Sequence, residues 1–420
     1  MIAQKLILYF AVLVLTVAAH YYAVLAFVLL SPWNILNDAI GWDPRLGWAC
    51  IIAARASYSA WKSQTYKIPR LALIMVVAFC ALAFTELQLG TRNLTGDDVD
   101  SSKSTLLYFG CGALAAFAII QLSDSFARLK ALLICAAVSI LFTVGFGMLE
   151  ASASYTSGMP SDRIPGTVGN PNYFAAFLGL GATCATVFWR SKWLAPKFFL
   201  LAAVLASIMC LVTLSRMGTV ACLIGVSTAL AIERSGKLFN LKTSLWLAAV
   251  VALGSGLAFG YLSSVRHSIT YSDDPMNVRN AERIQNVEDG TRLEAAQFSL
   301  DQWLTNPILG VGLNTIAARN YIQNGLYVTS HDTYLEILAG TGMCGALLLV
   351  FVSVYCIRTL PAPRRRLLLP ALAQLALCSF FGDYLQSIEL IVLFSILFVA
   401  ARDLPMTQRT VSPVEQTCVA

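Results

Sequence analysis

Long blocks of apolar residues recur along almost the whole chain, and no other feature of the sequence constrains the fold as strongly. Many of these blocks have about 17–25 residues, which is the length that an α-helix needs to cross a bilayer. Only 12% of the 420 residues are charged, whereas soluble domains contain about 25% charged residues. The sequence therefore predicts an all-α, polytopic membrane protein.

The apolar blocks predict about twelve transmembrane helices. They cover residues 5–30, 45–61, 69–88, 105–122, 129–149, 171–190, 197–214, 217–233, 243–264, 332–357, 367–382 and 387–402. The one long polar segment separates the ninth span from the tenth. We expect three parts, namely spans 1–9 over residues 1–264, a large loop with amphipathic helices over 265–331, and spans 10–12 with a short tail over 332–420.

Lysines and arginines are distributed unevenly between the connections that join these spans. Most of the 29 basic residues fall in every second connection and near the two ends of the chain. Because basic residues are retained on the cytoplasmic side of a membrane, both termini are predicted to be cytoplasmic and the large loop to lie on the outer face. This pattern accounts for the formal net charge of +6 without a nucleic-acid partner.

The cytoplasmic connections are short, and none contains a glycine-rich nucleotide motif or an H-E-x-x-H metal motif. We therefore expect no cofactor, and we expect any chemistry to lie on the outer face with a lipid-borne donor. The 11 cysteines fall almost entirely in apolar blocks and are interpreted as small buried hydrophobic residues. Asp97, Asp98 and Asp100 could hold a divalent metal, but a solvated outer loop is the favoured interpretation, and no metal site is predicted.

The large loop contains residue patterns that predict where helices begin and end. Thr291 followed by Glu294 has the spacing of a capping box and predicts that a helix starts there. Apolar residues then recur at helical spacing, namely Leu293, Ala296, Leu300, Trp303 and Leu304. Asn306-Pro307 ends this helix, the glycines that follow form a turn, and a second short helix is expected at about 314–323. Both helices are expected to lie on the membrane face with their apolar side against the bundle.

Three helices are expected to begin at the outer face, where their N–H groups and partial positive charge favour an anion. They begin near Asn170, Ser215 and Ser330, and Asn170 is a candidate N-cap. Arginines lie on the same face, and a guanidinium matches phosphate oxygens in bidentate geometry. The candidate pyrophosphate-binding residues are Asn172, Arg163, Arg216, Arg279, Arg283 and Arg292. For Arg216 the alternative is a snorkelling anchor, and for Arg279 and Arg283 it is a solvated helix face.

His331 is one of three histidines and stands at the junction between the large loop and the tenth span. A helix N-terminus disfavours the imidazolium, and the neutral imidazole is the form that a general base requires. The alternative is a histidine that only caps the helix or lies at the membrane interface. His331 is the candidate catalytic residue.

Four segments carry a family resemblance, in this order: G-T-V-G-N-P-N-Y-F-A at 166–175, L-S-R-M-G at 214–218, R-L-E-A-A-Q-F-S-L-D-Q-W-L-T-N-P-I-L-G-V-G at 292–312 and S-H-D-T-Y-L-E-I-L-A-G-T-G at 330–342. Together they resemble the O-antigen ligase family of bacterial inner membranes, whose superfamily also contains O-antigen polymerases and protein O-oligosaccharyltransferases. The resemblance covers the second half of the chain well, and the first half only in its series of spans.

The resemblance implies a GT-C-like fold and a glycosyltransferase of the inner membrane with its active site on the periplasmic face. In this family a glycan moves from undecaprenyl pyrophosphate to an acceptor without metal or ATP, and the ligase uses a sugar hydroxyl of the lipid A–core oligosaccharide. The resemblance also implies that His331 is the base or positions the acceptor, and that Arg216 and Arg292 bind the pyrophosphate. Many members have His-Asn where this chain has His331-Asp332, so no role is carried over for the amide.

Two alternatives to a ligase stay open. A polymerase or a protein O-oligosaccharyltransferase would use the same donor with a different acceptor. A transporter of lipid-linked glycans would need charged groups along a pathway at the membrane midplane, whereas the charges of this chain gather at the outer ends of the helices. The expected function is therefore that of an O-antigen ligase in lipopolysaccharide biosynthesis.

Overall fold

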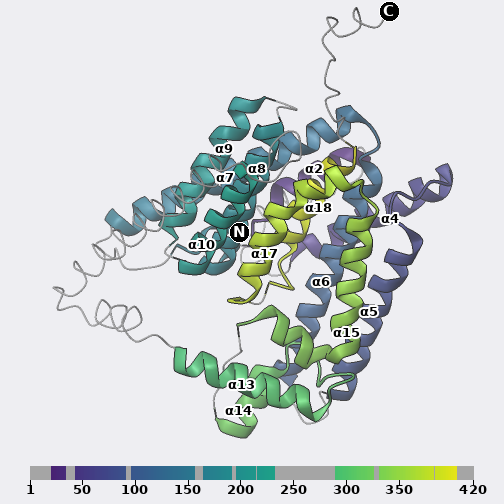
Figure 1. The fold of residues 1–420 in the computed structure, drawn as a ribbon, viewed down its shortest axis with the longest axis vertical. Helices are drawn as coiled ribbons and strands as arrows, with labels where there is room; N and C mark the ends of the chain where they lie inside the picture. The colour runs from purple at the N-terminus through teal and green to yellow at the C-terminus, as the bar shows by residue number, and fades with distance from the viewer. Residues whose placement is uncertain are drawn as a thin grey trace, which may run out of the picture.

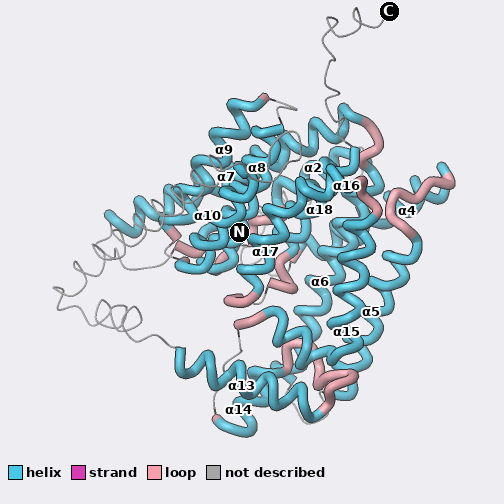
Figure 2. Tube along the Cα trace, viewed as in Figure 1, coloured by secondary structure: helices cyan, strands magenta, loops and turns pink. Residues whose placement is uncertain are grey.

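Helices supply all the regular structure in the part of the chain that the computed structural model describes, which is residues 20–34, 43–90, 96–156, 164–191, 195–213, 215–231, 289–325, 331–382 and 384–403 (Figure 2). The α-helices are α2 (His20–Leu30), α4 (Pro44–Ser63), α5 (Arg70–Gly90), α6 (Gly96–Leu122), α7 (Phe126–Thr156), α8 (Pro171–Ser191), α9 (Pro196–Val212), α10 (Arg216–Ala231), α13 (Asp289–Thr305), α14 (Ile316–Asn324), α15 (Thr333–Arg358), α16 (Ala362–Arg365), α17 (Leu369–Ser379) and α18 (Ile388–Asp403). Two short 3₁₀ helices are η2 (Gly166–Val168) and η3 (Arg366–Leu368).

Most of the predicted spans coincide with a described helix. By length and composition, four helices among the described residues could cross a membrane: Lys103–Leu122, Phe126–Ala153, Pro171–Ser191 and Thr333–Arg358. Shorter apolar helices cover Tyr21–Leu30, Pro196–Val212 and Arg216–Ala231. For the described residues, an all-helical fold with helices of membrane-spanning length is thus confirmed, whereas the number of twelve spans and the GT-C topology stay predictions. The predicted ninth span, 243–264, lies outside the described residues.

Helix α8 lies at the centre of one half of the bundle (Figure 1). Its residues 174–188 are all buried, which is the pattern of a helix surrounded by other helices. Helices α9, α10, α17 and α18 pack around it. Small residues permit the close approach of α10, because a Cβ added at Gly218 would lie 2.4 Å from the Cβ of Ala175. The L-S-R-M-G segment therefore fixes the start of α10 against α8.

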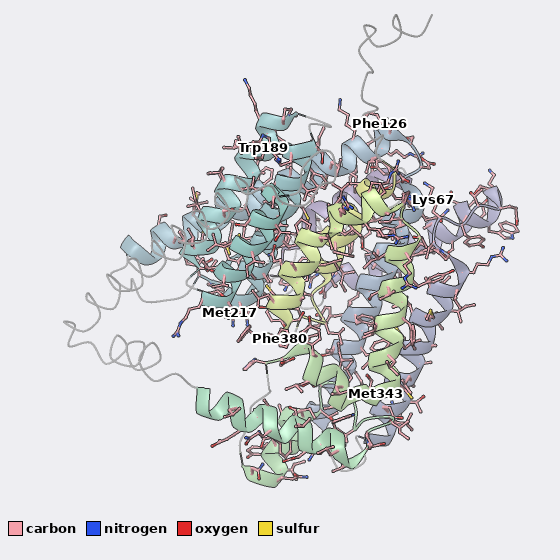
Figure 3. All side chains as sticks on the ribbon, viewed as in Figure 1. Lys67, Phe126, Trp189, Met217, Met343 and Phe380 are labelled. Atoms are coloured by element: carbon pink, nitrogen blue, oxygen red, sulfur yellow. The ribbon has the colours of Figure 1, made fainter. Side chains whose placement is uncertain are left out.

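Connections that were predicted to be cytoplasmic meet at one end of the bundle. Lys67, between α4 and α5, donates from Nζ to the carbonyl of Ser123, which follows α6 (2.6 Å). Arg402 of α18 donates from Nη2 to the carbonyl of Ile120 (3.2 Å). Lys67 and Phe126 are labelled at the upper end in Figure 3, and Met217 and Phe380 lie well below them. The helix ends that form the candidate site lie at the level of Met217 and Phe380 in Figure 3.

The predicted tenth span is not one continuous helix. Gly342 has φ 63° and ψ −168°, which breaks α15 into two segments. The segment 307–312 fills this break and pairs with residues 339–344 through backbone hydrogen bonds, and we call this contact the glycine joint. Its bonds run from Val311 N to Ala339 O (2.8 Å), Gly312 N to Gly340 O (2.9 Å), Met343 N to Pro307 O (2.9 Å) and Cys344 N to Ile308 O (3.1 Å).

Only glycine fits at several positions of the glycine joint. Gly310 has φ +83°, and a Cβ there would lie 2.5 Å from the backbone nitrogen of Gly342. A Cβ at Gly340 would lie 2.7 Å from the Cα of Leu313. The glycines of N-P-I-L-G-V-G and A-G-T-G therefore serve one contact, in which two backbones approach each other directly.

The structure corrects three expectations about the outer segments. Helix α13 begins at Asp289, so Thr291 lies inside its first turn and is not the N-cap. Helix α6 begins at Gly96, so the acidic run at 97–100 belongs to a helix start and not to a loop. Acidic residues at that position are favoured by the helix dipole.

The third correction concerns the leucines in the apolar stripe of α13, which do not face the bundle, whereas Trp303 of the same stripe packs against the cluster of Val311, Ile316 and Ala339. Leu293, Leu300 and Leu304 are 61%, 42% and 60% exposed. The buried side of α13 carries small or polar residues instead, including Ala295 and Ser299, and the helix packs against α15. The helical period was predicted correctly, but the expectation that the leucines face the bundle was wrong.

Replacing Gly342 by alanine should destabilise the protein. Its left-handed φ disfavours alanine, and the new Cβ would lie 2.3 Å from the carbonyl oxygen of Ile308. We expect Gly342→Ala to lower the free energy of unfolding by at least ~2 kcal/mol, measured by thermal unfolding of the purified protein in detergent. Gly145→Ala is the matched control, because a Cβ at Gly145 of α7 meets no atom within 4 Å. Equal stability of the two variants would contradict this account of the joint.

Candidate functional site

The first turns of α4, α8 and α18 meet at a cavity of about 400 Å³. Residues from η2, α6 and the turn before α18 complete its wall. It is lined by Asn34, Arg45, Tyr108, Val168, Gly169, Asn170, Tyr173, Gln386, Ser387 and Glu389. We call it the N-terminal cavity, because three helix N-termini open onto it. Its volume falls in the range of about 300–1,000 Å³ that is usual for small-molecule sites.

Arg45 supplies the positive charge of the N-terminal cavity and is almost fully paired. Its Nε donates to Asp43 Oδ1 (2.9 Å) and its Nη2 to Asp43 Oδ2 (2.5 Å), which makes a bidentate ion pair. Its Nη1 donates to the carbonyl of Ser31 (2.8 Å) and lies 3.9 Å from Glu389 Oε2. Glu389 Oε1 accepts from Ser387 Oγ (2.7 Å). One buried cation thus faces two buried carboxylates.

The start of α8 connects the N-terminal cavity to α10. Asn170 caps α8, as predicted, since its Oδ1 accepts from the backbone N of Asn172 (2.9 Å) and of Tyr173 (3.4 Å). Asn172 Oδ1 in turn accepts from Ser215 Oγ (3.1 Å). The next residue, Arg216, is the first of α10, and its side chain is exposed. The structure therefore brings the predicted residues Asn172 and Arg216 together on adjacent helix starts.

His331 lies directly before the N-cap of α15. It has φ +50°, a left-handed conformation that is uncommon outside glycine but is enriched for histidine. Asp332 is the N-cap, and its Oδ1 accepts from the backbone N of Tyr334 (2.8 Å) and of Leu335 (3.1 Å). Burial raises the pKa of the Asp332 carboxyl, and these two hydrogen bonds oppose that rise.

This geometry lets an aspartate at residue 332 do what an asparagine would do. Asp and Asn are about equal as N-cap residues, because either side-chain oxygen accepts the first free N–H groups of the helix. The amide itself is not required for that task. Asp332 holds the start of α15, and the backbone turn at His331 follows from where that helix begins.

Side-chain contacts connect the segment of His331 with α8. Thr333 Oγ1 donates to the carbonyl of Gly382 (2.5 Å) and accepts from the backbone N of Tyr384 (3.0 Å). The ring of Tyr384 packs edge-on against that of Tyr173, with 5.1 Å between their centres. Two more rings, those of Tyr334 and Phe380, pack 4.8 Å apart. In Figure 3 Phe380 and Met217, the neighbour of Arg216, lie at the same level of the molecule.

Hydrogen bonds extend this arrangement to the large loop. Gln386 Nε2 donates to the hydroxyl of Tyr173 (2.9 Å), and its Oε1 accepts from Thr105 Oγ1 (3.2 Å). Thr105 Oγ1 also accepts from Asn314 Nδ2 (2.9 Å). Asn314 directly follows the glycine joint. A polar network therefore links the loop, α6, the start of α18 and the N-terminal cavity.

The other predicted arginines are placed only in part. Arg163, Arg279 and Arg283 lie outside the described residues, so their roles stay predictions. Arg292 is in the first turn of α13, as expected. Arg319, on the same loop, has a structural partner, since its Nη2 donates to the carbonyl of Val311 (2.9 Å) and so supports the glycine joint.

Sequence reasoning did not identify the N-terminal cavity. The sequence patterns give no role in a site to Arg45, at the start of the predicted span 45–61, or to Tyr108, Tyr173 and Gln386. The available signal was Asp43-Pro44-Arg45, which has the form of a capped helix start with Pro at its first position. A charged pair at the start of an otherwise apolar span is costly unless it is satisfied, and that cost could have marked the site.

The fold and the site together define an all-helical membrane protein with a polar site where several helices begin. Residues 201–350 match the family model described as O-antigen ligase. The match confirms the family resemblance and supports a ligase- or polymerase-type, glycosyltransferase-like enzyme. No curated protein matches the chain. The matched residues include Arg216, Arg292 and His331, whereas every residue of the N-terminal cavity lies outside them.

The capping role of Asp332 can be tested without an activity assay. Asp332→Ala removes both cap hydrogen bonds and should cost the first turn of α15 about 1 kcal/mol. Hydrogen–deuterium exchange at the amides of Tyr334 and Leu335 should then be about fivefold faster. Asp332→Asn should exchange at nearly the wild-type rate. If Asp332→Asn exchanged as fast as Asp332→Ala, the negative charge and not the cap bond would hold the turn.

Proposed function

We propose that the protein is an O-antigen ligase that transfers a glycan from undecaprenyl pyrophosphate to a sugar hydroxyl of the lipid A–core oligosaccharide. One observation carries the proposal. The family match contains both Arg216 and His331, and contacts through Asn172, Tyr173 and Tyr384 join the helix starts on which they stand. A donor-binding arginine and a base could therefore act on one substrate complex.

The donor would be held through its pyrophosphate. Arg216 is exposed at the first position of α10, where the N–H groups of the helix add partial positive charge. We assign Arg292 to the same task, with Arg163, Arg279, Arg283 and Asn172 as further candidates. Donors that are fixed before the reaction stabilise the charge that develops on the leaving pyrophosphate.

His331 would act as general base in a single displacement. The imidazole takes the proton of the acceptor hydroxyl, and the hydroxyl oxygen forms a bond to the anomeric carbon. The bond from that carbon to the pyrophosphate oxygen breaks, and its electron pair leaves with undecaprenyl pyrophosphate. One displacement inverts the anomeric configuration. The reaction needs no ATP, because the pyrophosphate linkage supplies the energy, and we propose that it needs no metal.

Both substrates are anchored in the bilayer, which brings them into proximity. The positive-inside pattern supports cytoplasmic termini in the inner membrane and an active site on the periplasmic face. The exposed leucines of α13, namely Leu293, Leu300 and Leu304, suit contact with lipid at that surface, because an amphipathic helix buries its apolar face in the interface.

The proposal predicts a metal-independent transfer that requires His331 and Arg216. Purified protein would be mixed with lipid-linked O-antigen and rough lipopolysaccharide, with EDTA and without ATP, and a ladder of larger lipopolysaccharide would be read on a gel. We expect His331→Ala to lose the ladder. Arg216→Lys keeps the charge but loses the bidentate fork, and it should slow transfer at least about tenfold. Arg128→Lys is the matched control at the opposite end of the bundle.

The same assay separates the alternative functions. Growth of the lipid-linked glycan without a lipopolysaccharide ladder would identify a polymerase, and glycan on a protein acceptor would identify a protein O-oligosaccharyltransferase. A full ladder from His331→Ala would refute the proposed mechanism while leaving the ligase function intact. The folding of each variant would be checked by its elution as a monodisperse species.

A further inference from the structure

The N-terminal cavity is poorly suited to a pyrophosphate. Its cation, Arg45, is held by Asp43 in a bidentate ion pair, and Glu389 lies beside the same guanidinium. Because Asp43 holds the guanidinium and the Glu389 carboxyl adds a second acid group beside it, Arg45 is not free to bind an anion. Asp43 also caps α4, and Glu389 stands in the first turn of α18. The partial positive charges of these two helix ends are therefore already balanced.

The same lining groups match the hydroxyls and apolar face of a sugar. Asn34 Nδ2 donates to the carbonyl of Val168 (3.0 Å), and its buried Oδ1 has no hydrogen-bond partner among the described residues. A buried acceptor of this kind is costly unless something donates to it. Glu389 and Gln386 add further polar groups, and Tyr108 and Tyr173 add aromatic rings. An uncharged ligand with several hydroxyls would form hydrogen bonds with these polar groups.

The position of the N-terminal cavity relates it to the proposed reaction. Tyr173 lines it, and the same ring packs against Tyr384, whose backbone N is bonded to Thr333 near His331. Asn170, another lining residue, caps the helix on which Asn172 meets Ser215 and the start of α10. A glycan that reacts beside His331 and Arg216 could thus extend into this cavity.

We propose that the N-terminal cavity binds an uncharged sugar residue of a glycan substrate, through Asn34, Gln386 and Glu389, and excludes the pyrophosphate. The proposal deepens the proposed function and rests on it. Both substrates contain such sugars, so the glycan could belong to the donor or to the acceptor. A sugar site separate from the arginines would fix which residue of the glycan reaches the reacting centre.

The experiment measures binding without turnover. Three soluble probes would be titrated into the purified protein: the oligosaccharide repeat released from the lipid-linked donor, the core oligosaccharide released from lipid A, and inorganic pyrophosphate. Binding would be followed by saturation-transfer NMR. Asn34→Leu removes the free acceptor at similar volume, and Glu389→Gln removes the charge. Asn324→Leu, on the exposed end of α14, is the matched control.

We expect one of the two oligosaccharides to bind the wild type, and the one that binds identifies the source of the sugar. Asn34→Leu and Glu389→Gln should each weaken that binding about five- to tenfold, as for the loss of one hydrogen bond to a buried group. Asn324→Leu should bind as wild type, and pyrophosphate should not compete with the oligosaccharide.

Other results would overturn the sugar site. One such result is that pyrophosphate competes with the oligosaccharide. The others are that both cavity variants bind with wild-type affinity, or that the folded wild type binds no oligosaccharide. The gel assay keeps this test apart from the proposed function. If the wild type makes the lipopolysaccharide ladder while both cavity variants bind and transfer normally, the sugar site is refuted and the ligase stands. If the wild type binds an oligosaccharide that the cavity variants lose but transfers nothing, the ligase is refuted instead.

Discussion

The direct contact between two backbones at the glycine joint fixes the large loop on the membrane bundle. Residues 307–312 replace the helical hydrogen bonds that α15 loses where Gly342 breaks it. A buried backbone group without a partner is costly, so neither the broken helix nor the loop would be stable alone. The joint separates the first segment of α15, which starts beside His331, from the second segment, which packs along α5. It therefore determines where the candidate base stands relative to α8.

Among the described residues, Arg45 and Arg216 differ in whether a carboxylate balances the charge of the guanidinium. Arg45 is buried, and carboxylates balance its charge, whereas Arg216 is exposed at a helix start. A paired, buried guanidinium orders its surroundings but attracts an anion only weakly, and an exposed one at a helix N-terminus attracts it strongly. The same residue type thus produces a charge-paired wall in one place and a candidate phosphate site in another, and contacts along α8 connect the two.

The sequence predicted the helices well because the length and composition of apolar blocks are local properties. It also predicted Asn170 as the cap of α8, since a cap depends on neighbours in the chain. It did not predict the break at Gly342, because the glycines at 340, 342 and 345 lie inside a block of spanning length, and glycines alone do not show that another backbone enters there. It placed the leucines of α13 against the bundle, which is wrong, because periodicity defines a face and not what covers it. The pairing of Arg45 with Glu389 joins distant parts of the chain, and no local pattern reports it.

The polar network from Asn314 to Tyr173 joins the loop to the cavity wall, and this connection limits how substrates could enter. Under the proposed function, a lipid-anchored donor would approach within the plane of the membrane, so its pyrophosphate would meet the helix starts while its glycan extended away from the bilayer. The loop covers that direction through α13 and α14, and the glycine joint holds it there. A sugar in the N-terminal cavity would contact Gln386, which already contacts Thr105 and through it Asn314. Binding of a sugar in the cavity would therefore affect the loop through these hydrogen bonds. A phosphate bound at Arg216 would instead affect the start of α8, through the hydrogen bond between Ser215 and Asn172.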